Sequence, residues 1–195
     1  MGLPQRNDPG LTVRDYMAST DERRWELIDG EVWDMSPAPV IRHQRMSADI
    51  YRALFDAVKA EFPKSGDAPP PGCQVLFAPI DVVLGDITVV QPDIVVVCDS
   101  AKLANGKFVE GAPDVVIEIL SPSTAKKDRS HKLRVYQRAA VPEYLIVDPY
   151  SNTVEQYVLQ DGKYGLPPNV FGPGDEIVLS ILPGQAFQVG EWLAE

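Results

Sequence analysis

The chain has 195 residues, 45% of them hydrophobic, and a formal net charge of −10. This size and apolar content allow a substantial core without disulfides or a structural metal, whereas the acidic balance argues against strong, sequence-independent affinity for nucleic acid. The sequence has no run of 18 apolar residues and its first eight residues lack the apolar stretch of a signal peptide, so we expect a cytoplasmic protein without a membrane partner. Cys73 and Cys98 lack metal-ligand spacing, and we expect reduced thiols, with one disulfide as the alternative.

Three local signals organise the N-terminal half. Thr12 and Asp15 have the spacing of a capping box, which opens a helix. Asp29-Gly30 supplies the positive φ angles of a type I′ turn and predicts a hairpin. Apolar residues at helical spacing from Met46 onward predict an amphipathic helix. The predicted elements are a helix at 12–18, paired strands at 25–28 and 31–35, a helix at 41–62, and a second hairpin with strands at 74–84 and 87–97 around Gly85-Asp86.

The C-terminal half combines several strands with one helix. Its Val- and Ile-rich runs, bounded by Gly and Pro, are typical of strands buried on at least one face. The predicted elements are a connection at 101–112, a strand at 113–120, a helix at 124–139, and strands at 143–148, 153–159, 163–165 and 177–182. This order implies a mixed β-sheet flanked by helices, an α/β or α+β fold with an N-terminal β-hairpin and extra C-terminal strands. We expect one domain over 1–195, with 1–11 as an N-terminal tail.

Two of the apolar strands carry a carboxylate each. Asp93 lies in the predicted strand 87–97, and Glu118 lies in the strand 113–120. Buried carboxylates are costly unless a cation neutralises them, and two that lie close together repel each other. A divalent cation with oxygen ligands and a nearby lysine are the simplest compensators. The pattern therefore predicts the outline of a hydrolytic metal site.

The helix after Glu118 offers the lysine. Lys132 lies about eight residues into that helix, or roughly 12 Å along its axis, so a helix that folds back over its parent strand returns Lys132 to Glu118. Tyr136 and Asp128 are one turn away on either side and share the face of Lys132. The alternative is that Lys132 is an ordinary solvated helix residue.

Basic residues concentrate on the same helix. Between 126 and 138 there are six Lys or Arg residues against one acid, Asp128. This strip is a candidate for holding backbone phosphates without reading bases, and the alternative is a solvated helix face. The residues assigned to nucleic-acid binding are Lys126, Lys127, Arg129 and Arg134.

Signatures of other enzyme classes are absent from the sequence. It contains no Walker phosphate loop, no Gly-x-Gly-x-x-Gly dinucleotide motif and no Gly-x-Ser-x-Gly nucleophile elbow. With two histidines in the whole chain, a zinc hydrolase is disfavoured.

Several segments resemble the Uma family (the Uma-two type) of predicted endonucleases, which is placed in the PD-(D/E)XK, restriction-endonuclease-like superfamily. They are WELIDGEVWDMSP, VVQPDIVVVCD and GAPDVVIEILSPSTAKKDRSHKLRVYQRAAVPEYLIVDP, and the resemblance extends over about 12–190. It implies a restriction-endonuclease-like core, with Asp93 and Glu118 at the positions of the superfamily's two acidic residues. The superfamily's lysine is replaced by Leu120, and the resemblance implies that Lys132 takes its place.

The resemblance also implies that Glu31 and His43 line the site. For Glu31 the alternative is a solvated hairpin residue, and for His43 it is a partly buried histidine without a role in chemistry. Asp81 is a weaker candidate, because it shares the face of Asp93 only if the hairpin loop at Gly85 has an odd number of residues.

These observations together predict an endonuclease that hydrolyses phosphodiester bonds, most plausibly in DNA. Asp93, Glu118 and the backbone carbonyl of Ile119 would hold Mg²⁺ or Mn²⁺. Two other classes of protein fit the same sequence. One is a non-catalytic nucleic-acid- or protein-binding module that retains the fold, and the other is a structural or regulatory homodimer whose charged cluster is only an ion-pair network.

Overall fold

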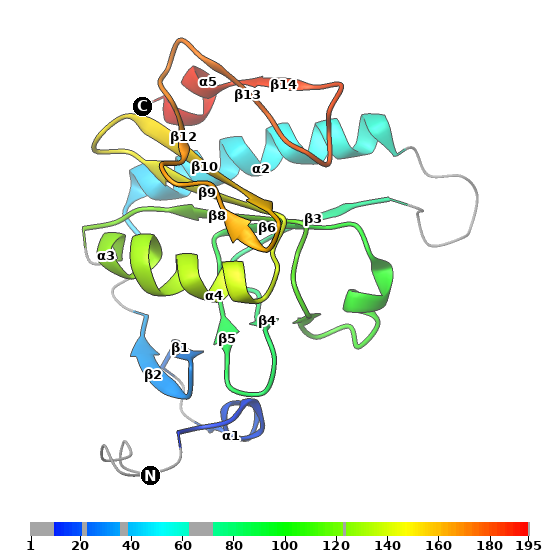
Figure 1. Cartoon of the computed structure of the whole chain (residues 1–195), viewed down its shortest axis with the longest axis vertical. Coiled ribbons are helices and arrows are strands. Elements are labelled where there is room, and N and C mark those ends of the chain that lie inside the picture. The colour runs from blue at the N-terminus through cyan, green and yellow to red at the C-terminus, as the bar shows by residue number, and fades with distance from the viewer. Residues whose placement is uncertain (1–9, 21–22, 36–38, 63–71, 123, 195) are drawn as a thin grey trace.

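Two larger β-sheets, a two-stranded sheet and several helices make up this computed structural model, which describes residues 10–20, 23–35, 39–62, 72–122 and 124–194 (Figure 1). The helical elements are α1 (Val13–Met17), α2 (Ile41–Glu61), the 3-10 helix η1 (Ser100–Leu103), α3 (Ala125–Lys127), the π-helical turn η2 (Asp128–Lys132), α4 (Leu133–Arg138) and α5 (Val189–Leu193). The strands are β1 (Trp25–Ile28), β2 (Glu31–Asp34), β3 (Gln74–Phe77), β4 (Val82–Val83), β5 (Val89–Val90), β6 (Ile94–Val97), β7 (Val109–Glu110), β8 (Val115–Ile119), β9 (Glu143–Asp148), β10 (Thr153–Gln160), β11 (Lys163–Tyr164), β12 (Asn169–Phe171), β13 (Glu176–Val178) and β14 (Ala186–Gln188).

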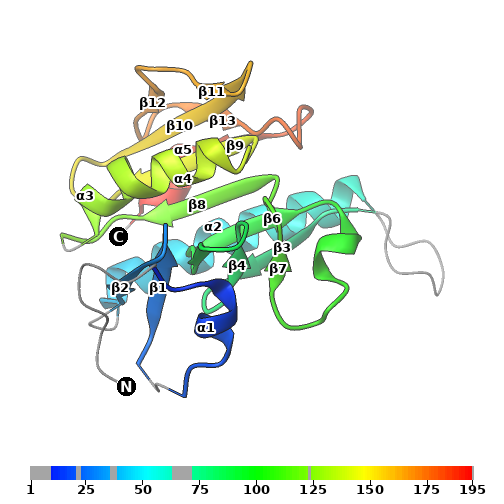
Figure 2. The same ribbon diagram turned by 60° about the horizontal axis from the view of Figure 1, so that its bottom comes forward.

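The larger sheet has seven strands in the order β11-β10-β9-β8-β6-β3, with β12 paired to β10. Strands β8 and β9 run parallel, and the other pairs in this sheet are antiparallel. The predicted mixed sheet flanked by helices is therefore confirmed. In Figure 2, β10 and β12 lie at the opposite end of the molecule from α1 and the β1–β2 hairpin.

The smaller sheet has five strands in the order β2-β1-β5-β4-β7. Its β1–β2 hairpin has the predicted turn, with φ angles of 53° at Asp29 and 77° at Gly30. The second predicted hairpin is only partly right, because each of its long strands is divided between the two sheets. The breaks contain Pro79 and Pro92, and proline has no backbone N–H to donate to a ladder.

Helix α2 covers one face of the larger sheet. Met46, Ile50 and Leu54 are fully buried and belong to the same apolar cluster as Ile117 on β8 and Leu145 on β9. The helix and its buried stripe agree with the prediction for 41–62. None of the helices in the described part of the chain has the length and apolar character that crossing a bilayer requires.

The segment α3-η2-α4 covers the other face of the same sheet (Figure 1). Val135 and Tyr136 pack there with Val116 and Leu120 of the β8 region. The sequence predicts one uninterrupted helix over 124–139, whereas the structure contains a π-helical turn at Asp128–Lys132. A π-helical turn changes the direction of the side chains it carries and is often found at functional sites.

Two further predictions need correction. The cysteines are not separate thiols, because Cys73 and Cys98 form a disulfide. Gln74 and Val97 form the end pair of the β3–β6 ladder. Cys73 precedes Gln74 and Cys98 follows Val97, so the two cysteines face each other across the two strands. The last predicted strand, 177–182, is shorter, since β13 ends at Val178 and pairs with the unpredicted β14.

Candidate active site

Strand register brings Asp93 and Glu118 together. Ile94 of β6 pairs with Ile117 of β8, so the next antiparallel position sets Asp93 opposite Glu118. The backbone N–H of Ile119 donates to Asp93 Oδ2 at 2.8 Å, which fixes that carboxylate beside the strand. Both carboxylates line a pocket of about 600 Å³, where Glu118 is 4% exposed.

Lys132 reaches Glu118 from the π-helical turn. Its Nζ lies 2.7 Å from Glu118 Oε1, and the Tyr136 hydroxyl donates to the same oxygen at 2.8 Å. Asp128 Oδ1 is 3.7 Å from Lys132 Nζ, at the i, i+4 spacing expected along this face. Lys132 and Tyr136 therefore contact Glu118 as the fold-back geometry predicts, and Asp128 contacts Lys132, although their catalytic roles remain predictions.

A second buried glutamate, which the sequence analysis missed, completes the cluster. Glu26 of β1 is 0% exposed, and its carboxylate contacts Lys132 Nζ at 2.9 Å and Lys127 Nζ at 2.7 Å. The backbone N–H of Gln91 donates to Glu26 Oε1 at 2.8 Å. Lys132 is thus held between two glutamates from different sheets. Glu26 shares a strand face with buried Ile28, and that spacing is the signal that could have identified it.

Glu31 lies away from this cluster, contrary to the expectation. It is exposed and pairs with Ile28 next to the hairpin turn, whereas Trp33, which pairs with Glu26, lines the pocket. The hairpin therefore points its open end toward the pocket and its turn away from it. This orientation depends on how the hairpin docks onto β5, which the local sequence does not specify.

Asp81 also takes a different place from Asp93. Its Oδ1 accepts hydrogen bonds from the Tyr16 hydroxyl at 2.9 Å and from the Gln91 amide at 2.8 Å, and it does not line the pocket. Asp81 fixes the side chain of Gln91, whose backbone N–H binds Glu26. Its contribution to the cluster is therefore indirect.

His43 lines the pocket from the first turn of α2. Its Nε2 lies 3.0 Å from the carbonyl oxygen of Ile119 and 3.3 Å from Asp93 Oδ2. Burial opposes the charged imidazolium, but the hydrogen bond and negative charge of Asp93 prevail and raise the pKa of His43 above its usual value. His43 therefore links Asp93 to the Ile119 carbonyl, the two groups expected to serve as ligands with Glu118.

The predicted basic strip does not form one exposed surface. Lys127 is buried against Glu26, and Arg129 binds Asp148 at 2.8 Å and Glu155 at 2.6 Å. Lys126 and Arg134 are exposed. Lys127 and Arg129 are therefore not the solvent-facing phosphate contacts that we expected. Acidic residues from other elements neutralise them, and the spacing of residues along the helix does not predict these acids.

The cluster shifts the pKa values of its members in opposite directions. Burial, aided by the negative charges of Asp128, Asp93 and Glu26, raises the pKa of Glu118 to about 8 despite Lys132. Burial also acts to raise the pKa of Glu26, but its two lysines and the hydrogen bond from Gln91 lower it overall. Burial opposes the charge on Lys132, yet the surrounding carboxylates raise the pKa of its ammonium well above the usual value. Glu118 thus takes up a proton more readily than an ordinary glutamate.

The oxygen atoms facing the pocket suit a hard divalent cation. Asp93, Glu118 and the Ile119 carbonyl offer oxygen donors, the ligand type that Mg²⁺ prefers. Glu26, Asp93, Glu118 and Asp128 form a cluster of four carboxyl groups with two lysines. Among the described residues, no group of three or more His, Cys, Asp or Glu side chains is arranged to hold a metal. A bound ion would therefore keep several waters, as Mg²⁺ does.

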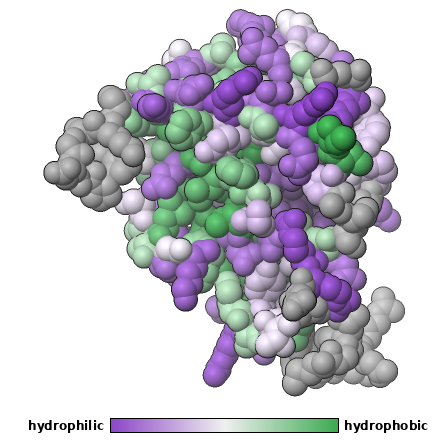
Figure 3. All heavy atoms as spheres, turned by 180° about the vertical axis from the view of Figure 1, so that it is seen from behind, coloured by the Kyte–Doolittle hydropathy of each residue, from purple (hydrophilic) through white to green (hydrophobic). Residues whose placement is uncertain are grey.

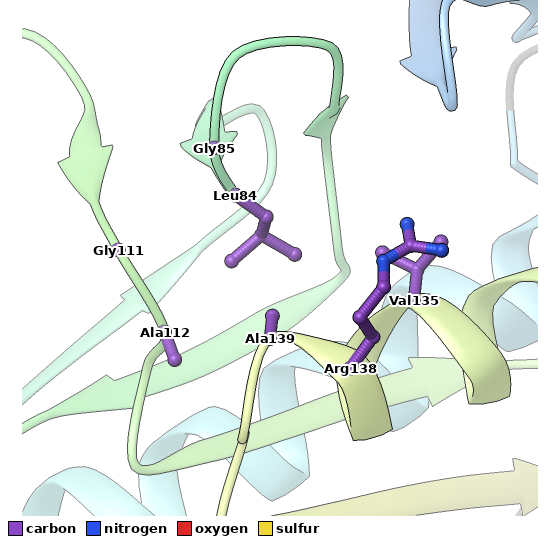
Figure 4. A pocket seen from close by; sticks show the side chains of 7 residues that line it. All are labelled: Leu84, Gly85, Gly111, Ala112, Val135, Arg138 and Ala139. Atoms are coloured by element: carbon purple, nitrogen blue, oxygen red, sulfur yellow. The ribbon is translucent and has the colours of Figure 1, made fainter.

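A second, smaller cavity has no comparable chemistry. About 290 Å³ in volume, it lies between the Gly85 turn, the Gly111 segment and the end of α4 (Figure 4). Leu84 and Ala139 line it with small or apolar surface, and its charged side chain, Arg138, is paired with Asp29. The acidic pocket is the better candidate for catalysis.

Comparison with known proteins assigns the fold and then the family. The fold is restriction-endonuclease-like. A crystal structure described as a "putative nuclease belonging to DUF820 from Anabaena variabilis ATCC 29413" matches with a TM-score of 0.73 over 94% of this chain and 97% of that chain, at 18% identity. The chain belongs to the Uma2 family, described as "Putative restriction endonuclease", whose model matches residues 13–190. The resemblance seen in the sequence is thereby confirmed.

Two relatives come from Synechocystis sp. (strain ATCC 27184 / PCC 6803 / Kazusa), and both are described as uncharacterised. The protein slr1290 is 35% identical over 162 residues, which cover 81% of this chain and 79% of the relative. The protein sll1609 is 28% identical over 177 residues, covering 88% and 94% respectively. The similarity therefore extends over most of each protein.

Proposed function

We propose that this protein is a metal-dependent endonuclease that hydrolyses phosphodiester bonds in DNA. The observation that carries the proposal is that Asp93 and Glu118 line the same pocket at one end of the sheet, with the Lys132 ammonium 2.7 Å from Glu118. This arrangement faces a pocket, and the chain belongs to a family described by its restriction-endonuclease character. Two carboxylates and a lysine beside a pocket suit phosphodiester hydrolysis, because its transition state gains negative charge that a metal ion and an ammonium can offset.

Asp93, Glu118 and the Ile119 carbonyl would hold Mg²⁺ or Mn²⁺, which supplies Lewis-acid activation of the phosphate and of a bound water. Lys132 keeps its proton, since the surrounding carboxylates raise the pKa of its ammonium. From its position beside Glu118 it would donate a hydrogen bond to the attacking water or to a phosphate oxygen. It would thereby offset the negative charge that grows in the transition state.

Other residues of the cluster would keep these groups in place. The hydroxyl of Tyr136 donates to Glu118 Oε1, and burial together with the charge of Glu118 raises the pKa of Tyr136, which keeps that donor protonated. Glu26 holds Lys132 from the opposite side. His43 connects the Ile119 carbonyl with Asp93. Each acts on the position of another group and not on the substrate itself.

The test is cleavage of supercoiled plasmid DNA with Mg²⁺ or Mn²⁺, with EDTA as the metal-free control. Asp93→Asn and Glu118→Gln should abolish cleavage, and Lys132→Ala should lower the rate by about 10²- to 10⁴-fold, since it removes a proton donor and a positive charge. Glu31→Gln is the matched control, because that glutamate is exposed and lies outside the pocket lining. Equal cleavage by the wild type and Glu118→Gln would overturn the proposal.

One observation favours a second candidate, a binding module whose cluster is purely structural. Lys132 already contacts Glu26 and Glu118, so its charge is balanced without a substrate. This alternative expects a folded protein with no cleavage of supercoiled, linear, single-stranded or branched DNA under any metal condition. The same plasmid assay, extended to those four forms, separates the two candidates.

A further inference from the structure

Cationic surface is scarce around the acidic pocket. The protein has a net charge of −10, and two of the four cations expected to meet phosphates, Lys127 and Arg129, are instead bound to glutamate or aspartate. Phosphate neutralisation supplies most sequence-independent affinity for duplex DNA. A substrate that binds here must therefore gain part of its affinity from contacts other than phosphate.

The pocket mouth offers aromatic side chains for that purpose. The face seen in Figure 3 shows hydrophobic residues lying among hydrophilic ones on the surface. Two of the large exposed aromatic residues line the acidic pocket: Phe77 is 56% exposed and Tyr150 is 64% exposed. Aromatic rings at this level of exposure offer a face on which a base can stack.

Phe77 and Tyr150 line the pocket from the strands that flank those of the carboxylates, with Phe77 on the α2 face of the sheet beside Tyr51. The strands at this end follow the order β9, β8, β6, β3, with Tyr150 just after β9 and Phe77 at the end of β3. Glu118 lies on β8, and Asp93 directly precedes β6, the two strands between them. Three strand spacings of about 4.8 Å separate β9 from β3, so the two aromatic positions are roughly 14 Å apart across the sheet.

Both positions are held by their surroundings. The ring of Phe77 makes an edge-on contact with Tyr51, with 4.8 Å between ring centroids, and the adjacent Ala78 N–H donates to the Asp93 carbonyl at 2.9 Å. The backbone N–H of Tyr150 donates to Asp148 Oδ1 at 2.8 Å. The Phe77 ring, held by this contact, loses little conformational freedom when a base stacks on it, and the hydrogen bond at Tyr150 fixes the backbone that carries the second ring.

We propose that Phe77 and Tyr150 form a stacking platform that makes single-stranded, unpaired DNA the preferred ligand of this pocket. The inference rests on the proposed function and adds its substrate class. The bases of a duplex are already stacked on one another, so the two rings that line this pocket reach only bases that have left the stack. Arg24 and Arg42, which also line the pocket, supply positive charge for the connecting phosphates.

The test separates binding from cleavage. A fluorescent single-stranded oligonucleotide and its blunt duplex are titrated with the full chain in EDTA, and affinity is read by anisotropy. The wild type should bind the single strand at least about tenfold more tightly than the duplex. Phe77→Ala and Tyr150→Ala should each weaken single-strand binding by about 5- to 150-fold, the effect of losing one stacked base.

Matched variants keep the result interpretable. Phe77→Tyr and Tyr150→Phe should retain affinity because they keep the ring, and Val170→Ala should change nothing, since Val170 is exposed on β12 outside the pocket lining. Equal affinity for duplex and single strand, no measurable single-strand binding, or unchanged affinity in both alanine variants would overturn the inference. Single-strand binding that depends on the rings, without any cleavage, would support this inference and contradict the nuclease proposal. Cleavage of duplex DNA that neither alanine variant alters would support the nuclease proposal and contradict this inference.

Discussion

Two buried glutamates on neighbouring strands have opposite surroundings. Glu143 of β9 is 0% exposed, and its partners are neutral: the Gln156 amide donates to it at 2.6 Å and the Ser180 N–H at 2.9 Å. Glu118 of β8 is almost as deeply buried but contacts the Lys132 ammonium and lines the acidic pocket. A buried carboxylate in a strand is thus not by itself a mark of a catalytic site. Its partners and its access to a pocket make the distinction.

The largest expected effect is a loss of stability when Lys132 is replaced, because Glu118 has this cationic partner and Glu143 has neutral ones. Lys132→Met leaves two buried carboxylates, Glu26 and Glu118, without a shared cation, and removing one partner of a buried ion pair costs about 3–5 kcal/mol. Urea unfolding at about pH 8 should show this loss, whereas Lys163→Met, on exposed β11 surface, should stay within about 0.5 kcal/mol of the wild type.

The double variant Lys132→Met/Glu118→Gln should recover part of the lost stability, because it removes one of the two unpaired charges. If Lys132→Met is no less stable than Lys163→Met, the buried ion-pair network contributes nothing to the free energy of unfolding. The two glutamates would then not differ in how their partners stabilise the fold.

A smaller effect separates the two glutamates directly. Glu143→Gln replaces an acceptor with an N–H₂ group that faces existing donors, and we expect it to reduce the free energy of unfolding by about 1–3 kcal/mol. Its cleavage rate per folded molecule should match the wild type. Glu118→Gln should give the converse, full stability at neutral pH and no cleavage. Loss of activity in both variants, with both folded, would remove the distinction.

A further effect that separates the two glutamates is a dependence of stability on pH. The pKa of Glu118 is raised to about 8, above its unfolded value, so the native state holds an extra proton between the two values. This contribution is present below the unfolded pKa and is lost as pH rises through about 8. In EDTA, the Tm of the wild type should therefore fall between about pH 6 and about pH 8.5. The Glu118→Gln curve should be flatter, and parallel curves would assign the titration to another group.

The contrast between local and distant contacts also explains what the sequence could predict. Local signals were sufficient for the capping box at Thr12, the turn at Asp29-Gly30 and helix α2, because neighbours in the chain determine these features. The meeting of Lys132 with Glu118 followed from a helix that returns over its own strand. Contacts between consecutive elements could therefore be predicted from the sequence.

Contacts between elements that are far apart in the sequence could not be predicted from it. The choice of Glu26 over Glu31 depends on how the β1–β2 hairpin docks against Lys127 and Lys132, about 100 positions later in the chain. The pairing of Arg129 with Asp148 and Glu155 likewise depends on strands that follow the helix. Helical periodicity alone assigned those cations to solvent because it carries no information about which acids approach them.

The most direct test of the central claim is a calorimetric titration of Mn²⁺ into the metal-free protein at about pH 8, where Glu118 can release its proton. The account predicts one site per chain in the wild type and in Glu143→Gln, and loss of that site in Asp93→Asn and in Glu118→Gln. Binding that is unchanged in Asp93→Asn and Glu118→Gln would contradict the claim that these two carboxylates hold the ion.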